Sequence, residues 1–147
     1  LKTKKNKEKD TTKSTPNLIP YDQQKKEHIK DAITGSIFKS TVDASHPLAF
    51  GYSNNYYSLK RTAKAFELLE NGHNVAYFSE DFKHISGYAG SNALKQIPNS
   101  LLFGTERKGR GTIIYMVDNP LFRSFWENGK LFLANAIFFV NNNKFRL

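Results

Sequence analysis

The residues best placed to bind a ligand follow a predicted strand near the C-terminal end of the sequence. Asp118 and Asn119 come directly after the apolar run 112–117, and Arg123 follows four residues later. The carboxyl end of a strand is the usual place for ligand sites in open α/β sheets, so these three side chains are the candidate ligand-binding set. The favoured alternative is structural: Asp118 caps the following helix, and Arg123 forms an i, i+4 ion pair with Glu127.

The sequence contains no complete catalytic set. It has no cysteine, which excludes a thiolate nucleophile, a thiolate metal site and a disulfide framework. Ser91, in GYAGSNAL, is the nearest approach to the G-x-S-x-G elbow of serine hydrolases, but its glycines fit a closely packed loop better. The turn 104–111 (GTERKGRG) lacks the Lys-Ser/Thr pair of a phosphate loop and leads into strand-like residues. No catalytic residue is assigned.

The four histidines do not predict a metal site. His28 and Asp31 have the i, i+3 spacing that two ligands on a helix need, but they lie in a lysine-rich segment with no third ligand nearby. His46, His73 and His84 stand beside turn residues and are interpreted as turn or surface histidines. We therefore assign no metal ligand and expect no cofactor in this chain.

Composition divides the 147 residues into a polar N-terminal part and a folded part. The first 31 residues hold nine lysines and five acidic residues, with almost no large apolar side chains before Leu18. Such a segment cannot bury enough surface to offset its ordering entropy. We expect a disordered basic linker over 1–20, one α/β domain over 21–140, and a tail over 141–147.

The charge and hydropathy patterns also limit the partners. The formal net charge is +9, but the N-terminal lysines alternate with acidic residues and threonines, and no recognition motif accompanies them. A solvated linker therefore explains them better than nucleic-acid binding. No apolar run is long enough to cross a bilayer, so no membrane span is expected.

Hydrophobic periodicity predicts a mixed α/β domain. The expected elements are an exposed helix over 21–34, strands over 37–42, 56–59 and 75–78, and a segment over 63–69 that fits either a helical turn or a strand. The strongest strands are 100–104 and 112–117. The glycine-bearing turn 105–111 joins them and predicts an antiparallel hairpin.

The last predicted element is helical. Residues 120–140 have apolar side chains at near-helical spacing, interrupted at Asn128 and Gly129, which predicts either two successive helices or one bent helix. Pro120 suits the first turn of this helix, with Asp118 or Asn119 as its N-cap.

Several segments together resemble a known family. They are HPLAFGY (46–52), NVAYF (74–78), SGYAG (86–90) and NSLLFGTERKGRGTIIYMVDNPLFRSFWENGKLFLANAIFF (99–139). The chain thereby resembles the C-terminal region of zinc carboxypeptidase-like proteins found mainly in Bacteroidetes, which end in a domain similar to class I glutamine amidotransferases. The resemblance spans 33–140, and 109–130 is its most specific part.

For the fold, the resemblance implies a partial flavodoxin-like, class I amidotransferase-like sheet with a C-terminal antiparallel hairpin and a packing C-terminal helix. Amidotransferases of this class use a cysteine nucleophile, so without cysteine the likeness concerns the fold alone. The zinc of the parent belongs to its peptidase domain, and the pair His28 and Asp31 is not the H-x-x-E motif of that domain.

For the function, the resemblance implies a non-catalytic accessory domain of a protein that hydrolyses peptide bonds. Its expected partner is the peptidase domain of the same parent, with homo-oligomerisation as a further arrangement, and its expected location is extracellular or periplasmic. The alternative is a ligand- or substrate-binding module whose site the rest of the parent completes, through Asp118, Arg123 or the loop around Ser91.

Overall fold

The computed structural model describes residues 1–4 and 20–140, which fold as a mixed α/β domain, as the sequence predicts. In chain order the elements are α1 (Tyr21–Lys30), β1 (Ile33–Val42), η1 (Pro47–Ala49), β2 (Asn55–Lys60), β3 (Gly72–Phe78), β4 (Lys83–Ala89), α2 (Ser91–Leu94), β5 (Ser100–Lys108), β6 (Gly111–Met116), η2 (Phe122–Ser124) and α3 (Glu127–Phe138). The η elements are short 3-10 helices.

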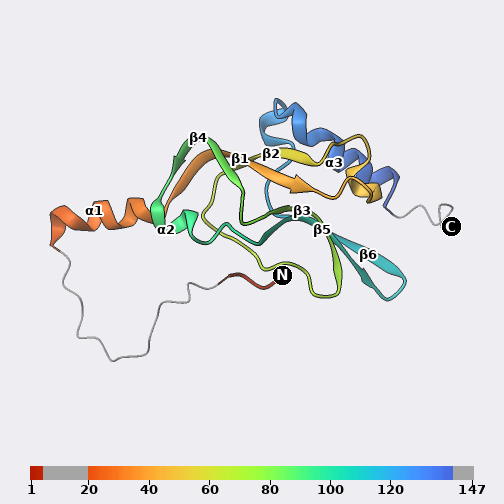
Figure 1. Ribbon diagram of the computed structural model, residues 1–147, viewed down its shortest axis with the longest axis horizontal. Helices are drawn as coiled ribbons and strands as arrows, with labels where there is room; N and C mark the ends of the chain where they lie inside the picture. Colours follow the sequence, from red (N-terminus) through yellow and green to blue (C-terminus); the bar gives the residue numbers. More distant parts are fainter. Residues whose placement is uncertain (5–19, 141–147) are drawn as a thin grey trace.

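The strands form one curled sheet in the order β2-β1-β3-β5-β6, with β4 also paired to β1 (Figure 1). Strand β1 pairs with β2 along one side. Its other side pairs first with β4 and then, at Thr41 and Val42, with β3. Every strand pair in the described residues is antiparallel, so the flavodoxin-like detail is not confirmed. A flavodoxin-like sheet is parallel, and parallel strands need a long crossover connection, usually a helix. The connection between β3 and β4, residues 79–82, is too short for such a crossover.

The predicted C-terminal hairpin is confirmed, with a tighter turn than the sequence indicates. Strand β5 runs on through Lys108, and β6 starts at Gly111, so only Gly109 and Arg110 connect them. Gly109 has φ +58, the left-handed conformation that a two-residue hairpin loop requires.

The C-terminal helix α3 packs on the sheet through one buried aromatic side chain. Phe132 is fully buried and contacts three rings, those of Tyr52, Tyr56 and Phe103, at centroid distances of 4.1, 5.1 and 4.6 Å. One turn further on, Nδ2 of the Asn135 side chain donates to the backbone carbonyls of Leu48 and Phe50. The predicted packing helix is thus confirmed. It contacts the sheet through Phe132 and is hydrogen-bonded to the η1 segment through Asn135.

A tyrosine hydroxyl ties α3 to the segment after η1. The hydroxyl of Tyr52 donates to the carbonyl of Asn128 at 2.8 Å and accepts from the amide of Phe132 at 3.1 Å. Burial of the ring raises the pKa of Tyr52 to about 12, and the hydrogen bond from Phe132 opposes that rise in pKa. The hydroxyl therefore stays protonated and keeps both hydrogen bonds at neutral pH.

The start of the C-terminal helical region differs from the prediction. Instead of a helix from Pro120, η2 is followed by α3, whose N-cap is Trp126 rather than Asp118 or Asn119. Arg123 and Ser124, in η2, have φ +49 and +58, which an α-helix does not adopt, so one continuous helix from Pro120 is excluded. The alternative of two successive helices is the correct one.

The sequence predicts an interruption of the helix at Gly129, but Gly129 lies inside α3. A Cβ atom there would stand 2.2 Å from the carbonyl oxygen of Pro120. Gly129 therefore permits a close backbone approach between α3 and the loop before η2, and does not break the helix.

Two further segments were left open or unassigned by the sequence. The open choice at 63–69 resolves to extended structure, since Phe66 and Glu67 form isolated bridges with Thr3 and Ser100. Strand β4 is not among the predicted elements, because its seven residues carry no hydrophobic alternation and are nearly all exposed.

The predicted linker and tail fall largely on 5–19 and 141–147, outside the described residues. The described residues 1–4 lie along 65–67, with the amide of Lys4 donating to Ala65 and that of Glu67 to Lys2. Within 20–140, α1 projects away from the sheet (Figure 1). None of the helices in the described residues combines the length and hydrophobicity that crossing a bilayer requires.

Two phenylalanines of α3 provide a matched test of this packing. Phe132 is 0% exposed and Phe138 is 68% exposed. Phe132→Ala should lower the free energy of unfolding by about 3–5 kcal/mol, since it leaves a cavity among three rings. Phe138→Ala should change it by less than about 0.5 kcal/mol. Urea unfolding followed by circular dichroism measures both, and equal effects would contradict the assigned faces of α3.

Candidate functional site

The candidate site is built around a carboxylate buried between the two edge strands of the sheet. Asp118 lies two residues beyond β6, where the chain leaves one edge and crosses back to β2 at the other. Its Oδ2 accepts from the hydroxyl of Ser58 at 2.6 Å, and its Oδ1 lies 3.5 Å from Nζ of Lys60. The side chains of Lys60 and Asp118 are only 2% and 7% exposed.

Strand alternation explains why β2 supplies both partners. Tyr56, Ser58 and Lys60 are the buried residues of β2, whereas Tyr57 and Leu59 between them face the other way. Lys60, the last of these buried residues, needs a counter-charge, because burying an unpaired ammonium group costs much free energy. Asp118 provides it.

Tyr56 and Trp126 extend the polar cluster. Burial raises the pKa of Tyr56 far above its ordinary value, and the charge of Asp118 raises it further, whereas the indole N–H of Trp126 acts to lower it. The indole faces the phenol without reaching hydrogen-bond geometry, so Nε1 of Trp126 has no full hydrogen-bond partner in the described part of the chain. The phenol of Tyr56 is therefore neutral and unsuited to act as a base.

The other two predicted ligand residues lie on the surface of the same loop. Oδ1 of Asn119 accepts from the amide of Leu121 at 2.9 Å, which makes an Asx turn. Arg123 is exposed, and its guanidinium lies 5.2 Å from the ring centroid of Phe122. The predicted ion pair between Arg123 and Glu127 is not what the structure shows, because the partner of Glu127 is Lys130.

The three predicted residues therefore share one loop without converging on one ligand. Asp118 points inward to the ion pair, Asn119 stabilises a turn, and Arg123 faces solvent. Sequence reasoning missed Ser58, Lys60 and Arg61. The alternation of Tyr56, Ser58 and Lys60 was available as a signal, but its hydroxyl and ammonium groups make it look like a solvent face.

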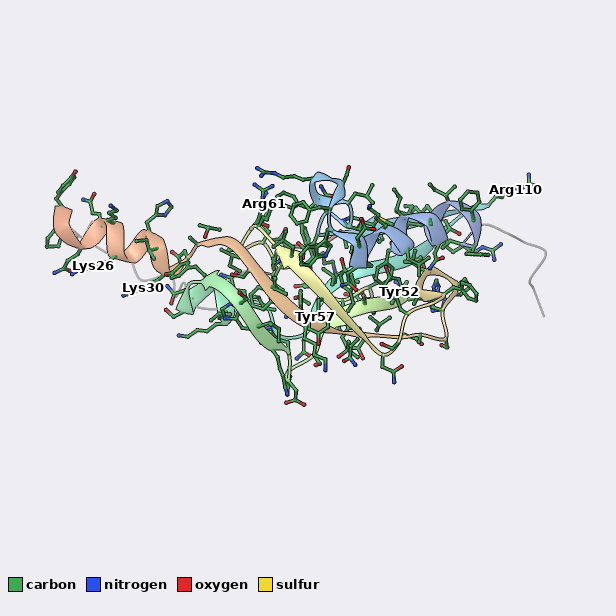
Figure 2. The ribbon with its side chains drawn as sticks, turned by 90° about the horizontal axis from the view of Figure 1, so that it is seen from above. Lys26, Lys30, Tyr52, Tyr57, Arg61 and Arg110 are labelled. Carbon is green, nitrogen blue, oxygen red and sulfur yellow. The ribbon has the colours of Figure 1, made fainter. Side chains whose placement is uncertain are left out.

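Arg61 brings a second guanidinium to this loop. It follows Lys60 directly, and its Cζ lies 4.7 Å from the ring centroid of Phe122. Figure 2 shows Arg61 beside the light-blue loop that carries η2, with Arg110 far away at the tip of the β5–β6 hairpin. Two cations thus contact one aromatic ring, and one of them, Arg61, is the sequence neighbour of Lys60 in the buried ion pair.

The glycine-rich motifs serve packing. Before Ser91, a Cβ at Gly87, in β4, would lie 2.2 Å from the carbonyl oxygen of Gly35, and one at Gly90 would lie 2.1 Å from that of Lys30. These positions admit only glycine because two backbones meet there. In the β5–β6 hairpin, the carboxylate of Glu106 accepts from the hydroxyl of Tyr115 at 2.8 Å.

Two of the histidines form a pair that the sequence did not indicate. Nδ1 of His46 accepts from the amide of Leu48 at 3.0 Å and so caps η1. Its Nε2 lies 3.2 Å from Oγ1 of Thr105, and its ring centroid lies 5.2 Å from that of His73. Because Nδ1 accepts, we place the proton of neutral His46 on Nε2, donating to Thr105.

The remaining histidines do not add to this pair. His28 is exposed on α1, and His84 stacks on Phe38 at a centroid distance of 4.9 Å. Among residues 1–4 and 20–140, no three histidine, cysteine, aspartate or glutamate side chains are grouped so that they could hold a metal ion.

Comparison with known proteins adds no family assignment, since no family model, curated protein or solved structure matches this chain.

Replacing one member of the buried ion pair should lower the free energy of unfolding, and replacing the second member as well should restore part of that loss. Asp118→Leu and Lys60→Met should each lower the free energy of unfolding by about 3–5 kcal/mol, because each leaves a buried charge without its partner. The double variant should recover at least about 2 kcal/mol of the summed loss, since two apolar side chains then replace two charges. Denaturant melts of the four proteins measure this coupling, and strictly additive losses would contradict it.

The cap at His46 predicts a pH-dependent stability. Burial lowers the pKa of His46, the neighbouring His73 lowers it further, and Asp43 partly opposes both. A pKa lowered in the folded state means that the full stability is present above the unfolded value and is lost as the pH falls through the folded value. Protonation would also turn the accepting Nδ1 into a donor facing the amide of Leu48.

The measurement is the Tm between pH 7 and pH 5. The wild-type Tm should fall over this range, and the fall should be smaller in His46→Asn, because asparagine can cap η1 without titrating. His28→Asn, on the exposed helix α1, is the matched control and should fall as the wild type does. An unchanged pH dependence in His46→Asn would show that this histidine does not carry the effect.

Proposed function

We propose that this chain is a non-catalytic accessory domain that packs against the peptidase domain of a larger zinc carboxypeptidase-like protein. The observation that carries the proposal is an apolar surface on the outer side of α3, formed by Phe50, Leu131, Ile137, Phe138 and Phe139, which we call the α3 apolar surface.

The α3 apolar surface combines large side chains from two segments. Ile137 and Phe138 are 65% and 68% exposed. Phe138 follows Leu131 by seven residues and therefore lies on the same face of α3. At the end of the helix, Phe139 contacts Phe50, with their ring centroids 5.2 Å apart. A surface with this density of aromatic and aliphatic groups is characteristic of a protein contact.

Helix α3 has apolar side chains on more than one face. Its inner side holds Phe132 against the sheet, whereas its outer side carries Leu131 and Phe138. A helix that is hydrophobic nearly all round is normally covered on every side. The sheet covers only one side of α3, so a partner that covers the other is the simplest account.

The buried polar groups support a structural role. The carboxylate of Asp118 is engaged by Ser58 and Lys60. The side-chain amide of Asn135 donates to the backbone carbonyls on either side of Ala49. These groups fix one side of the fold to another. Positioning a rigid apolar surface is what an accessory domain needs.

The partner and its setting come from the family resemblance. The resemblance implies that the parent hydrolyses peptide bonds with a zinc ion in its peptidase domain and acts in the extracellular space or in the periplasm. In this proposal the present chain contributes a contact surface, and the peptidase domain contributes the metal and the catalytic groups.

The docking surface can be tested without disturbing the fold. Ile137→Ser/Phe138→Ser should weaken binding to the parent peptidase domain at least about tenfold with an unchanged Tm, because each substitution removes exposed apolar area only. Ile85→Ser, at an exposed isoleucine of β4, is the matched control and should bind as the wild type does. Titration calorimetry measures all three.

Two outcomes would overturn the proposal. One is binding that the α3 double variant leaves unchanged. The other is robust, EDTA-sensitive peptide hydrolysis by this chain alone. Concentration-dependent self-association that the double variant abolishes would assign the α3 apolar surface to a homo-oligomer instead.

A further inference from the structure

Phe122, in the loop between β6 and α3, is contacted by two arginines. The guanidinium carbons of Arg61 and Arg123 lie 4.7 and 5.2 Å from the ring centroid of Phe122. Arg61 directly follows β2 and Arg123 lies in η2, so two segments far apart in sequence each place a cation against the same ring. Such an arrangement concentrates positive charge at one point of the surface.

The backbone under this cluster is strained. Arg123 and Ser124 both have positive φ, +49 and +58, although neither is glycine. Consecutive left-handed residues of this kind cost free energy and persist only where the surrounding contacts impose them. Here the contacts are the ion pair of Asp118 with Lys60, before η2, and the close packing of Gly129 on Pro120, after it.

The donors of both guanidinium groups are available. Within the described ranges, 1–4 and 20–140, neither Arg61 nor Arg123 forms an ion pair or a side-chain hydrogen bond, and both side chains are exposed. The nearby carboxylates are already engaged, Asp118 by Lys60 and Glu127 by Lys130. The cluster therefore holds two positive charges with no internal counter-charge.

We propose that Arg61 and Arg123 form a binding site for an oxyanion, a carboxylate or a phosphate group. Guanidinium groups bind such anions through paired N–H···O hydrogen bonds, and an anion shared by two of them offsets their mutual repulsion. The ring of Phe122 holds both planes in place and offers an apolar wall to the rest of the ligand. The site goes beyond the proposed accessory role and does not depend on it, since the α3 apolar surface takes no part.

The chain carries its own optical probe of this site. Trp126 is the only tryptophan of the sequence. Its ring contacts that of Phe125 at 6.5 Å, and Phe125 contacts Phe122 at 5.7 Å. An anion that reorders the cluster should therefore change the tryptophan emission.

The experiment titrates the purified chain with inorganic phosphate, and separately with acetate, at constant ionic strength set by chloride. The wild type should show a saturable change in emission and a rise in Tm with phosphate. Arg61→Gln and Arg123→Gln should each weaken the apparent affinity about tenfold, because each removes one of two charged donors. Arg110→Gln, which removes the same charge at the distant hairpin, should stay within about twofold of the wild type.

Saturation by phosphate alone assigns the site to phosphate-bearing ligands, whereas saturation by both anions assigns it to carboxylates as well. A wild type without a saturable response to either anion would overturn the proposal. So would an equal loss of affinity in Arg110→Gln, because the effect would then be one of net charge. The Tm measured without added anion is the control for misfolding. Both site variants should then have the Tm of the wild type.

Discussion

The fold depends on a buried contact between the two edges of its sheet. Strand β2 ends the sheet on one side and β6 on the other, and the chain leaving β6 returns to β2 through Asp118, Lys60 and Ser58. This contact sets where η2 and α3 begin. Because the charges are buried, neither partner can be left alone without a large cost in free energy, which makes the return path of the chain specific.

The positions of the arginine cluster and of the α3 apolar surface both follow from this contact. Holding Asp118 inward places the strained loop with Arg123 over the end of β2, beside Arg61. Holding the loop close to α3 requires Gly129 against Pro120. The helix then lays Phe132 on the sheet and turns Phe138 outward. The oxyanion site and the α3 apolar surface thus share one structural origin, although they would bind different partners.

Much of this fold could be predicted from the sequence, and the rest could not for identifiable reasons. The hairpin of β5 and β6 and the apolar helix have strong local patterns, and both are confirmed. Strand β4 has no such pattern, because its side chains are nearly all exposed. The role of Asp118 was misjudged because a carboxylate before a helix resembles a cap, whereas its true partners lie 58 and 60 residues away. Only the tertiary structure brings Lys60 and Ser58 to it.

The most direct test of the account is native-state hydrogen exchange of the backbone amides. The account predicts that the amides of α3 around Phe132 and those of β1 and β5 exchange with the same opening free energy, because the edge contact and the aromatic packing join them in one cooperative unit. If α3 instead opened at a much lower free energy than the sheet, the return of the chain through Asp118 would not hold the fold together, and the central claim would be wrong.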